Sequence, residues 1–343
     1  MKKFFTDILI SVLFVSVAFS QTSESSTSKV GTTAAQFLKI GAGARAIGMG
    51  GAYVAVSNDI YSTYYNPAGI AQVDETAEIA FNHANWLAGM NYDYVAGSLD
   101  LQDIGVIFGT LTSFSVPQDI VRTFEYPEGD GRTWDASSLA IGLGYARKLT
   151  DNFSVGFQFK YIREAIWTTS SSGFALDVGT YYVTPFNGLV IGASITNFGT
   201  KMQLSGRDIL FNYDPNGNTG SGPNDVLSQY STDSFDIPLT FRLGLAMDVV
   251  KTRYFRATAA VDATHPNDNT EYVDSGLELS YNELVAFRIG YKSLFMRNSE
   301  EGLTLGGGVN YKIDNQFTLQ FNYGWATYGV LNNVQFIDVG LKF

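Results

Sequence analysis

The sequence has 343 residues, a formal net charge of −11 and no cysteine. The acidic balance excludes a nucleic-acid partner, because no basic stripe is present to meet a phosphate backbone, and the lack of cysteine excludes disulfides and thiolate metal sites. Only 16% of the residues are charged, against roughly 25% in ordinary soluble domains, whereas the chain has 25 Phe, 20 Tyr and 35 Gly, which is unusual for a soluble protein.

The chain begins with a predicted signal peptide at residues 1–20. The opening MKKFFTDILISVLFVSVAFSQ places two lysines before an apolar stretch from Ile8 to Phe19, and small residues near its end predict cleavage after Ser20. An N-terminal membrane anchor is the alternative, but about twelve apolar residues fall short of the roughly twenty that a spanning helix needs. The polar residues 21–29 show no periodicity, and we expect them to be a disordered linker.

A glycine-rich stretch follows within residues 30–74. Residues 41–71, GAGARAIGMGGAYVAVSNDIYSTYYNPAGIA, contain six glycines, one arginine and one aspartate. GAGARA fits the G-x-G-x-x-[GA] fingerprint of dinucleotide-binding proteins, and Asp59 is roughly in range to hold a ribose. That chemistry needs a buried strand before the motif and a parallel α/β pattern after it. The sequence has neither, so we reject a nucleotide site.

We expect residues 30–74 to fold back into the lumen of a barrel as a hatch. Glycines let the backbone turn sharply and approach a wall closely, and Pro67 fixes its own φ and keeps Asn66 out of the α region. Arg45 and Asp59 would be costly charges in a lumen unless they pair with each other or with the wall. A short periplasmic helix and loop that gates nothing is the alternative. The predicted hatch residues are Arg45, Gly48, Gly50, Gly51, Asp59, Asn66, Pro67, Ala68 and Gly69.

From residue 75 to residue 343 the apolar residues recur at every second position, which is the period of a β-strand. This alternation also fits an exported soluble β-protein, but the second face of its strands would carry many lysines and glutamates. Here that face carries Gly, Ser, Thr, Asn and Gln, with an occasional charge such as Arg242, Glu278 or Arg288. Such a face suits an enclosed lumen, so the sequence predicts an all-β fold, a transmembrane antiparallel β-barrel.

The lengths of the predicted strands and connections agree with a membrane barrel. Strands are predicted within 139–145, 153–161, 174–178, 189–195, 237–249, 273–281, 285–291, 303–313, 317–325 and 337–343. Tight turns such as 149–152 and 280–283 contrast with two long connections, near 116–134 and 198–236, which we expect on the outer side. Without the roughly 60 residues of the two long connections, residues 75–343 would hold about 14 strands at roughly fifteen residues per strand and turn, an even number as in bacterial barrels.

The stretch FLKIGAGARAIGMGGAYVAVSNDIYSTYYNPAGIA resembles the N-terminal signature of the PorV/PorQ family, which is similar to the FadL-like outer-membrane transport proteins. Residues 44–46 and 49–52 match its ARA and MGGA portions, Asp59 matches its acid, and residues 66–69 match its NPAG. The rest of the chain agrees only in architecture and length. The resemblance implies a barrel with an N-terminal hatch, in contact with the lipid of the outer membrane of a Gram-negative-type bacterium.

The resemblance implies two alternative functions. The first is that of a PorV-like component of the type IX secretion system, which binds exported cargo and docks at the translocon and attachment complex. The second is that of a FadL-like channel for long-chain fatty acids or other hydrophobic small molecules. The connection at 198–236 suits either one, because exposed apolar residues can bind a protein or an apolar ligand. The candidates are Met202, Leu204, Ile209, Leu210 and Phe211.

The sequence predicts no enzyme, no cofactor and no metal site. A hydrolase would need serine and histidine brought together, and the two histidines are His83, in an early strand, and His265, beside a proline at a strand end. The stretch DPNGNTGSGPND at 214–225 faintly resembles a calcium loop. Thr219 stands where that loop needs glycine, so we expect a solvated turn.

Overall fold

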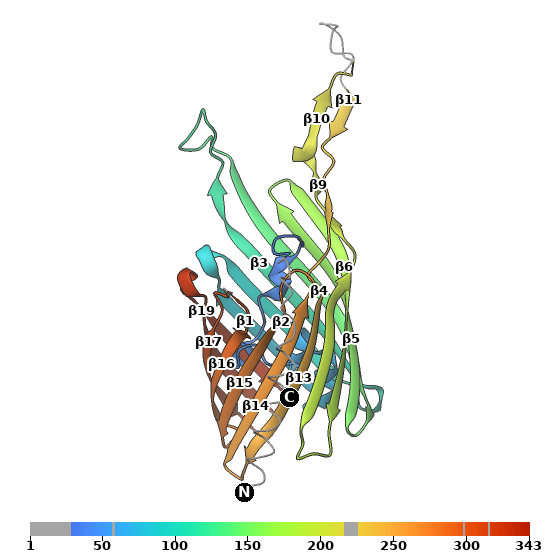
Figure 1. Cartoon of the computed structure of the whole chain (residues 1–343), viewed down its shortest axis with the longest axis vertical. Coiled ribbons are helices and arrows are strands. Elements are labelled where there is room, and N and C mark those ends of the chain that lie inside the picture. Colours follow the sequence, from blue (N-terminus) through green and yellow to red (C-terminus); the bar gives the residue numbers. More distant parts are fainter. Residues whose placement is uncertain (1–28, 57–58, 216–225, 298, 315) are drawn as a thin grey trace.

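In the computed structural model the described residues are 29–56, 59–215, 226–297, 299–314 and 316–343 (Figure 1). The predicted signal peptide at 1–20, nearly all of the predicted linker at 21–29 and most of the calcium-like stretch at 214–225 lie outside these residues. The described chain forms a β-barrel, and an N-terminal segment, residues 34–73, lies inside it.

Among the described residues, 14 long antiparallel strands close the barrel, which confirms the predicted fold class. Consecutive strands pair along the whole order, and the ring closes because the last strand pairs with the first, from Glu78↔Lys342 to Asn85↔Gln335. Closure gives each strand two partners, so its backbone groups are hydrogen-bonded in lipid. The strands are β1 (Ala77–Asn85), β2 (Asn91–Asp100), β3 (Val106–Ile120), β4 (Thr133–Thr150), β5 (Phe153–Ile166), β6 (Thr169–Val183), β7 (Val190–Gly199), β13 (Thr240–Lys251), β14 (Phe255–Pro266), β15 (Tyr272–Tyr281), β16 (Val285–Leu294), β17 (Leu303–Lys312), β18 (Thr318–Thr327) and β19 (Asn333–Lys342).

The side chains of each strand alternate between an exposed apolar row and a buried row of small or polar residues. In β16, Phe287 and Ile289 are exposed, while Ala286 and Arg288 are buried. A soluble protein would bury the phenylalanine and expose the arginine. The reversed order follows when the apolar row faces lipid and the other row faces an interior filled by protein, as the alternation predicted.

The two ends of the barrel differ in the length of their connections. At the short-turn end the strands are joined by residues 101–105, 151–152, 184–189, 252–254, 282–284 and 313–317, and β1 begins and β19 ends there. At the other end, the long-loop end, the strands are joined by the long connections 121–132 and 200–239 and by the shorter ones 86–90, 167–168, 267–271, 295–302 and 328–332. Figure 1 shows the β3–β4 hairpin and the 200–239 connection projecting well beyond the rim, whereas β14–β19 end close to it.

The two long connections have different bounds from those predicted. The connection predicted at 116–134 is shorter, because β3 and β4 remain paired up to Ile120↔Thr133. The predicted strand start at Ile237 is wrong: β13 begins at Thr240, and Pro238 just before it has no N–H to donate to a ladder. The 200–239 connection itself contains β8 (Met202–Gln203), β9 (Ser205–Gly206), η6 (Arg207–Ile209), β10 (Leu210–Tyr213), β11 (Val226–Gln229) and β12 (Ser234–Phe235).

The helical elements are short. The N-terminal segment contains η2 (Gln36–Lys39), α2 (Ala44–Gly48), α3 (Ser62–Tyr65) and η3 (Pro67–Gln72), and η4 (Leu87–Gly89), η5 (Gln102–Ile104) and η7 (Gly329–Leu331) lie in connections. In the part of the chain that the structure describes, no helix combines the length and apolar character needed to cross a membrane. The N-terminal segment supplies most of the buried apolar cluster, including Tyr53, Met49 and Ile60.

Candidate functional site

The N-terminal segment reaches opposite parts of the barrel wall. Helix α2 contacts β16, β17, β18 and β19, whereas η3 contacts β4, β5 and β6 on the other side. Between them, Tyr53 and Ile60 are fully buried. The contacts place most of the described residues between 35 and 73 within the lumen, whereas residues 30–32 and Asp74, at the two ends of the predicted range, are exposed. The action of residues 30–74 as a hatch that opens stays a prediction.

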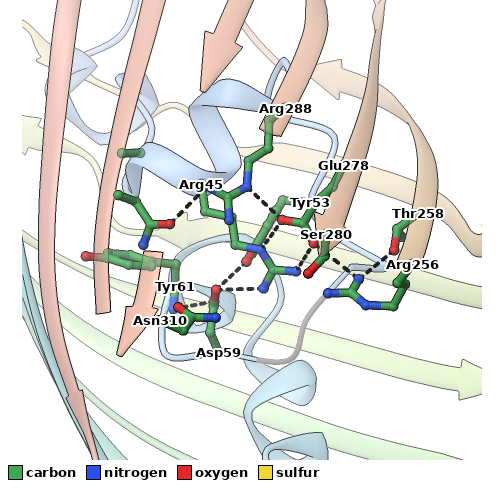
Figure 2. A network of polar contacts seen from close by, with 12 residues as sticks. Arg45, Tyr53, Asp59, Tyr61, Arg256, Thr258, Glu278, Ser280, Arg288 and Asn310 are labelled. Atoms are coloured by element: carbon green, nitrogen blue, oxygen red, sulfur yellow. Dashed lines mark hydrogen bonds and ion pairs between the residues drawn. The ribbon is translucent and has the colours of Figure 1, made fainter. Parts of the chain in front are cut away.

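A network of charges ties α2 to the wall (Figure 2). Arg45 donates through Nε and Nη2 to the two carboxylate oxygens of Glu278 on β15, both at 2.8 Å. Its Nη1 also donates to Asp59 at 3.0 Å, and the Tyr53 hydroxyl donates to the same carboxylate. Arg45 and Asp59 were expected to pair with each other or with the wall, and Arg45 does both.

Glu278 is the centre of this network. It accepts hydrogen bonds from Arg288 at 2.7 Å and from Arg256 at 3.2 Å in addition to those from Arg45. Arg256 also forms an ion pair with Glu283 at 2.8 Å. Burial disfavours the charged form of Arg45, and the carboxylates of Glu278 and Asp59 compensate for that cost. Paired charges of this kind are what a closed lumen tolerates.

Carboxylates of the wall also accept hydrogen bonds from the backbone of the segment. Asp262 on β14 accepts from the N–H groups of Tyr53 at 2.7 Å and Val54 at 2.9 Å. Asp338 on β19 accepts from the N–H of Ala44, at the start of α2, at 2.8 Å. A backbone without a regular ladder has N–H groups that need partners when buried, and these wall residues supply them.

The glycines of the motif lie against glycines of the wall. A Cβ on Gly48 would come within 2.9 Å of the Cα of Gly306 on β17, so neither residue has room for a side chain. Gly50 has φ 70°, and its Cβ would lie 2.7 Å from the carbonyl oxygen of Ser275. Close approach was the reason predicted for these glycines, and the wall meets them with glycines of its own.

The NPAG portion is fixed by the Asn66 side chain. Its Nδ2 donates to the carbonyl oxygens of Val54 and Thr180, each at 2.9 Å, and its Oδ1 accepts from the N–H of Ala68 at 3.1 Å. This last bond caps η3, which starts at Pro67. Asn66 therefore joins two parts of the segment to β6.

One cavity beside the segment is small and has both apolar and charged residues in its lining. It has a volume of about 20 Å³ and lies between η2 and the wall strands β2, β3, β5, β6, β7 and β13. Its lining includes Leu38, Tyr64, Tyr94, Lys160, Asp177 and Arg242. The Lys160 ammonium and the Asp177 carboxylate pair at 2.8 Å, so two of the lining charges already satisfy each other. A site of this size holds about one water molecule.

The predicted binding residues of the 200–239 connection are not all exposed. Met202 is buried against β6, so its place in an exposed apolar set is a wrong prediction. Leu204 and Ile209 line an open groove of about 370 Å³, which also includes Tyr230. Leu210 is exposed on β10, and the ring of Phe211 packs at a tilt against that of Tyr230, with 4.7 Å between the ring centroids.

Each of the two histidines pairs with a carboxylate. His83 on β1 pairs with Asp93 at 2.7 Å, and His265 on β14 pairs with Glu271 at 2.9 Å. No group of three or more His, Asp or Glu side chains suited to a metal ion occurs among the residues that the structure describes.

The motif was readable from the sequence, but its partners were not. Sequence reasoning noted Glu278, Arg242 and Arg288 only as occasional charges on the inner row, and it did not single out Asp262 or Asp338 at all. The available signal was weak and the same for each: a charged residue in an inner row that consists mostly of small or polar residues. The pairing of each acid with a particular N–H or guanidinium depends on the register of distant strands.

The fold is similar to that of solved outer-membrane proteins. The CymD monoaromatic hydrocarbon channel has a TM-score of 0.55 at 12% identity, covering 88% of this chain and 97% of that one. The Ralstonia pickettii toluene transporter TbuX has 0.52 at 12% identity, and a Pseudomonas aeruginosa FadL homologue has 0.51 at 11%, with the same coverage. At these identities the likeness shows the fold alone. No curated protein sequence matches the chain.

A family model described as type IX secretion system protein PorV matches residues 23–265, well over half of the chain. The chain belongs to the PorV family. The match confirms the resemblance seen in residues 44–52 and 66–69, and with the barrel it supports an outer-membrane location. In bacterial barrels the short turns are periplasmic and the long loops extracellular. The long-loop end of this PorV-family barrel is therefore its outer end.

Proposed function

We propose that this protein is a non-enzymatic component of the type IX secretion system that binds exported cargo and docks at the translocon and attachment complex. In this proposal the partners bind at the outer surface, and the lumen is not a path for them. The family match supports the system. The observation that supports the outer surface is the way in which the N-terminal segment is fixed inside the barrel.

The segment is held by bonds that are distributed over its whole length. Arg45 binds Glu278, the backbone at Tyr53 binds Asp262, and Asn66 binds the backbone of β6. Breaking one buried ion pair costs about 3–5 kcal/mol, so removal of the whole segment would need several such losses at once. A barrel filled in this way is a rigid support for its outer loops.

The outer connections present apolar side chains to solvent. The β10–β11 hairpin exposes Leu210, Tyr213 and Leu227, and Tyr230 follows it on the chain. The β3–β4 connection exposes Phe124 completely and Tyr126 partly. Both projections lie at the same end of the barrel, beyond the rim (Figure 1). Exposed aromatic and aliphatic groups on projecting loops are suited to contact with another protein.

The alternative, a FadL-like channel for hydrophobic compounds, draws support from the fold shared with hydrocarbon channels. The cavity beside the segment argues against it. A cavity of about 150 Å³ lined by apolar residues is known to hold benzene, whereas this one measures only about 20 Å³ and has the charged Lys160, Asp177 and Arg242 among its lining residues. Passage of an apolar solute would require the segment to leave its wall contacts.

The proposal is tested by a change confined to the outer hairpin. In the variant Leu210→Ser/Tyr213→Ser/Leu227→Ser the barrel contacts are intact, so we expect a normally inserted protein that no longer co-purifies with the translocon. Phe295→Ser is the matched control, because Phe295 is 83% exposed in a different outer connection. Unchanged co-purification of the triple variant would count against the proposal, and micromolar binding of a labelled fatty acid by the wild-type barrel would favour the channel.

A further inference from the structure

The first described residues of the chain lie at the outer mouth of the barrel. Thr33 forms a parallel bridge with Asp236, and the N–H of Ala34 donates to the carbonyl oxygen of Asp236 at 2.9 Å. Asp236 belongs to the 200–239 connection, just before β13 begins at Thr240. The start of the N-terminal segment is therefore attached to an outer connection.

A second outer connection holds the same stretch. Asp268, in the turn between β14 and β15, accepts hydrogen bonds from the Thr33 hydroxyl at 3.0 Å and the Gln36 amide at 2.7 Å. The Lys39 ammonium lies 2.8 Å from the same carboxylate. Asp268 is thus the common acceptor for three side chains of the segment.

A third attachment comes from β5. Glu164, two residues from the outer end of that strand, accepts from the N–H of Ala35 at 3.0 Å. The three acceptors, Glu164, Asp236 and Asp268, belong to different parts of the barrel mouth. Together they fix the position of residues 33–39 at the outer end independently of the contacts deeper in the lumen.

The other end of the segment lies at the opposite, periplasmic end of the barrel. The carbonyl oxygen of Thr76 accepts from the N–H of Asp100 at the inner end of β2, and Ala77 pairs with the C-terminal Phe343. The segment therefore crosses the lumen from the outer mouth at Thr33 to the inner end at Thr76, after which β1 runs outward again.

We infer that residues 29–33, the first described residues of the chain, are presented at the cell surface, while the end of β19 lies on the periplasmic side. Residues 29–32 are exposed, with Val30 at 68%. They adjoin the base of the 200–239 connection, where Lys201 and Asp236 form an exposed pair at 3.5 Å. This gives the outer surface a second protein element beside the loops, one that a surface-bound partner or protease can reach.

The sequence allows a clean test, because the chain has no cysteine. Val30→Cys is produced in the full-length protein and treated on intact cells with a membrane-impermeant maleimide. Val330→Cys, 82% exposed in the outer turn between β18 and β19, is the outer control, and Asp74→Cys, exposed before β1, is the periplasmic control. All three positions are exposed, so the folded barrel is retained, as checked by its heat-modifiable migration on gels.

We expect Val30→Cys to be labelled on intact cells to the same extent as Val330→Cys, and Asp74→Cys to be labelled only after the outer membrane is permeabilised. The inference would be overturned if Val30→Cys, like Asp74→Cys, were labelled only after the outer membrane is permeabilised. In a second measurement, Thr33→Cys/Asp236→Cys should form a disulfide on oxidation, since paired strand residues have their Cα atoms within the range of such a bond. Failure of that pair to oxidise in a folded barrel would contradict the placement of Thr33 at the mouth.

Discussion

Arg45 and Glu278 form a two-pronged ion pair across the lumen, with Arg45 on the N-terminal segment and Glu278 on the barrel wall. The same carboxylate also serves Arg288 and Arg256. The segment is therefore attached to a charge that the wall itself needs. The two members of the pair are therefore not equivalent. Loss of the Glu278 carboxylate removes one acceptor from each of three arginines, whereas loss of Arg45 leaves Glu278 with two arginine partners.

The asymmetry predicts unequal effects of two substitutions. Glu278→Gln should lower the free energy of unfolding by about 3–5 kcal/mol, since it takes the carboxylate partner from buried Arg288 and leaves Arg45 with Asp59 and Arg256 with Glu283. Arg45→Met should cost less, because Glu278 retains Arg288 and Arg256, and Asp59 retains the Tyr53 hydroxyl. Urea unfolding followed by gel migration of the folded barrel measures both. Equal losses would show that Glu278 is not the centre of the network.

The contact between Gly48 and Gly306 predicts that a single methyl group is destabilising at one wall glycine and harmless at its neighbour. A Cβ on Gly306 would lie 3.0 Å from the Cα of Gly48, whereas a Cβ on Gly307 meets nothing closer than 3.8 Å. We expect Gly306→Ala to cost about 1–3 kcal/mol, as overpacking does, and Gly307→Ala to be neutral. Thermal unfolding of the two variants tests this; a harmless Gly306→Ala would mean that α2 is not pressed against the wall.

Loss of the Asn66 amide should loosen the segment without changing the barrel. Asn66→Ala removes hydrogen bonds to the carbonyl oxygens of Val54 and Thr180, each worth about 1 kcal/mol, and the cap on Ala68. Asn66→Asp keeps the acceptor but turns the donor into a second acceptor facing two carbonyls, so it should be at least as damaging. Proteolysis of the segment in detergent measures the effect. Resistance equal to the wild type in both variants would contradict the role given to Asn66.

Asp268 and the side chains of Thr33, Gln36 and Lys39 that bind it form a clamp on the start of the segment. The stability of this clamp should decrease in acid. Burial of Asp268 opposes its ionisation, but hydrogen bonds from Lys39, Gln36 and Thr33 outweigh it, so the pKa of its carboxyl is lowered. A lowered pKa stabilises the folded clamp at all pH values above the unfolded value of about 4, and the effect is lost as pH falls through the folded pKa. The clamp should therefore be complete at neutral pH and loosen only below about pH 4.

Fluorescence anisotropy of a dye on Val30→Cys follows this clamp. The anisotropy should stay constant from pH 8 to pH 5 and fall in more acidic solution, whereas Asp268→Asn should show a low value with little pH dependence throughout. A fall in anisotropy that begins near pH 7, or one that Asp268→Asn shares, would assign the change to another group.

The barrel was predictable because the same alternation of residue types recurs in every strand. In β16 and in the strands around it, an apolar residue at every second position and a small or polar one between them define which row faces lipid, and no knowledge of the neighbouring strands is needed. The same holds for the need of Arg45 for a partner, which follows from the cost of an unpaired buried charge. The partner itself could not be predicted, because Glu278 lies 233 residues away and faces Arg45 only through the register of the closed sheet.

The outer connections were the least predictable part. Met202 and Leu204 are two residues apart in one apolar stretch, yet Met202 is buried against β6 and Leu204 lines an open groove. From composition alone, both residues are expected to be equally exposed. Their different burial arises from the two-residue ladder of β8 with β12, which is too short to leave a periodic signal in the sequence.

The most direct measurement of the central claim, that this protein works through its outer surface with a filled lumen, is secretion with the segment locked in place. In Thr33→Cys/Asp236→Cys the oxidised disulfide ties the outer end of the segment, and β1 already ties its inner end, so the segment cannot leave the barrel. We expect cells with the oxidised variant to release type IX cargo at the level of the Thr33→Cys single variant. Secretion that stops on oxidation and returns on reduction would contradict the claim and show that the segment has to move.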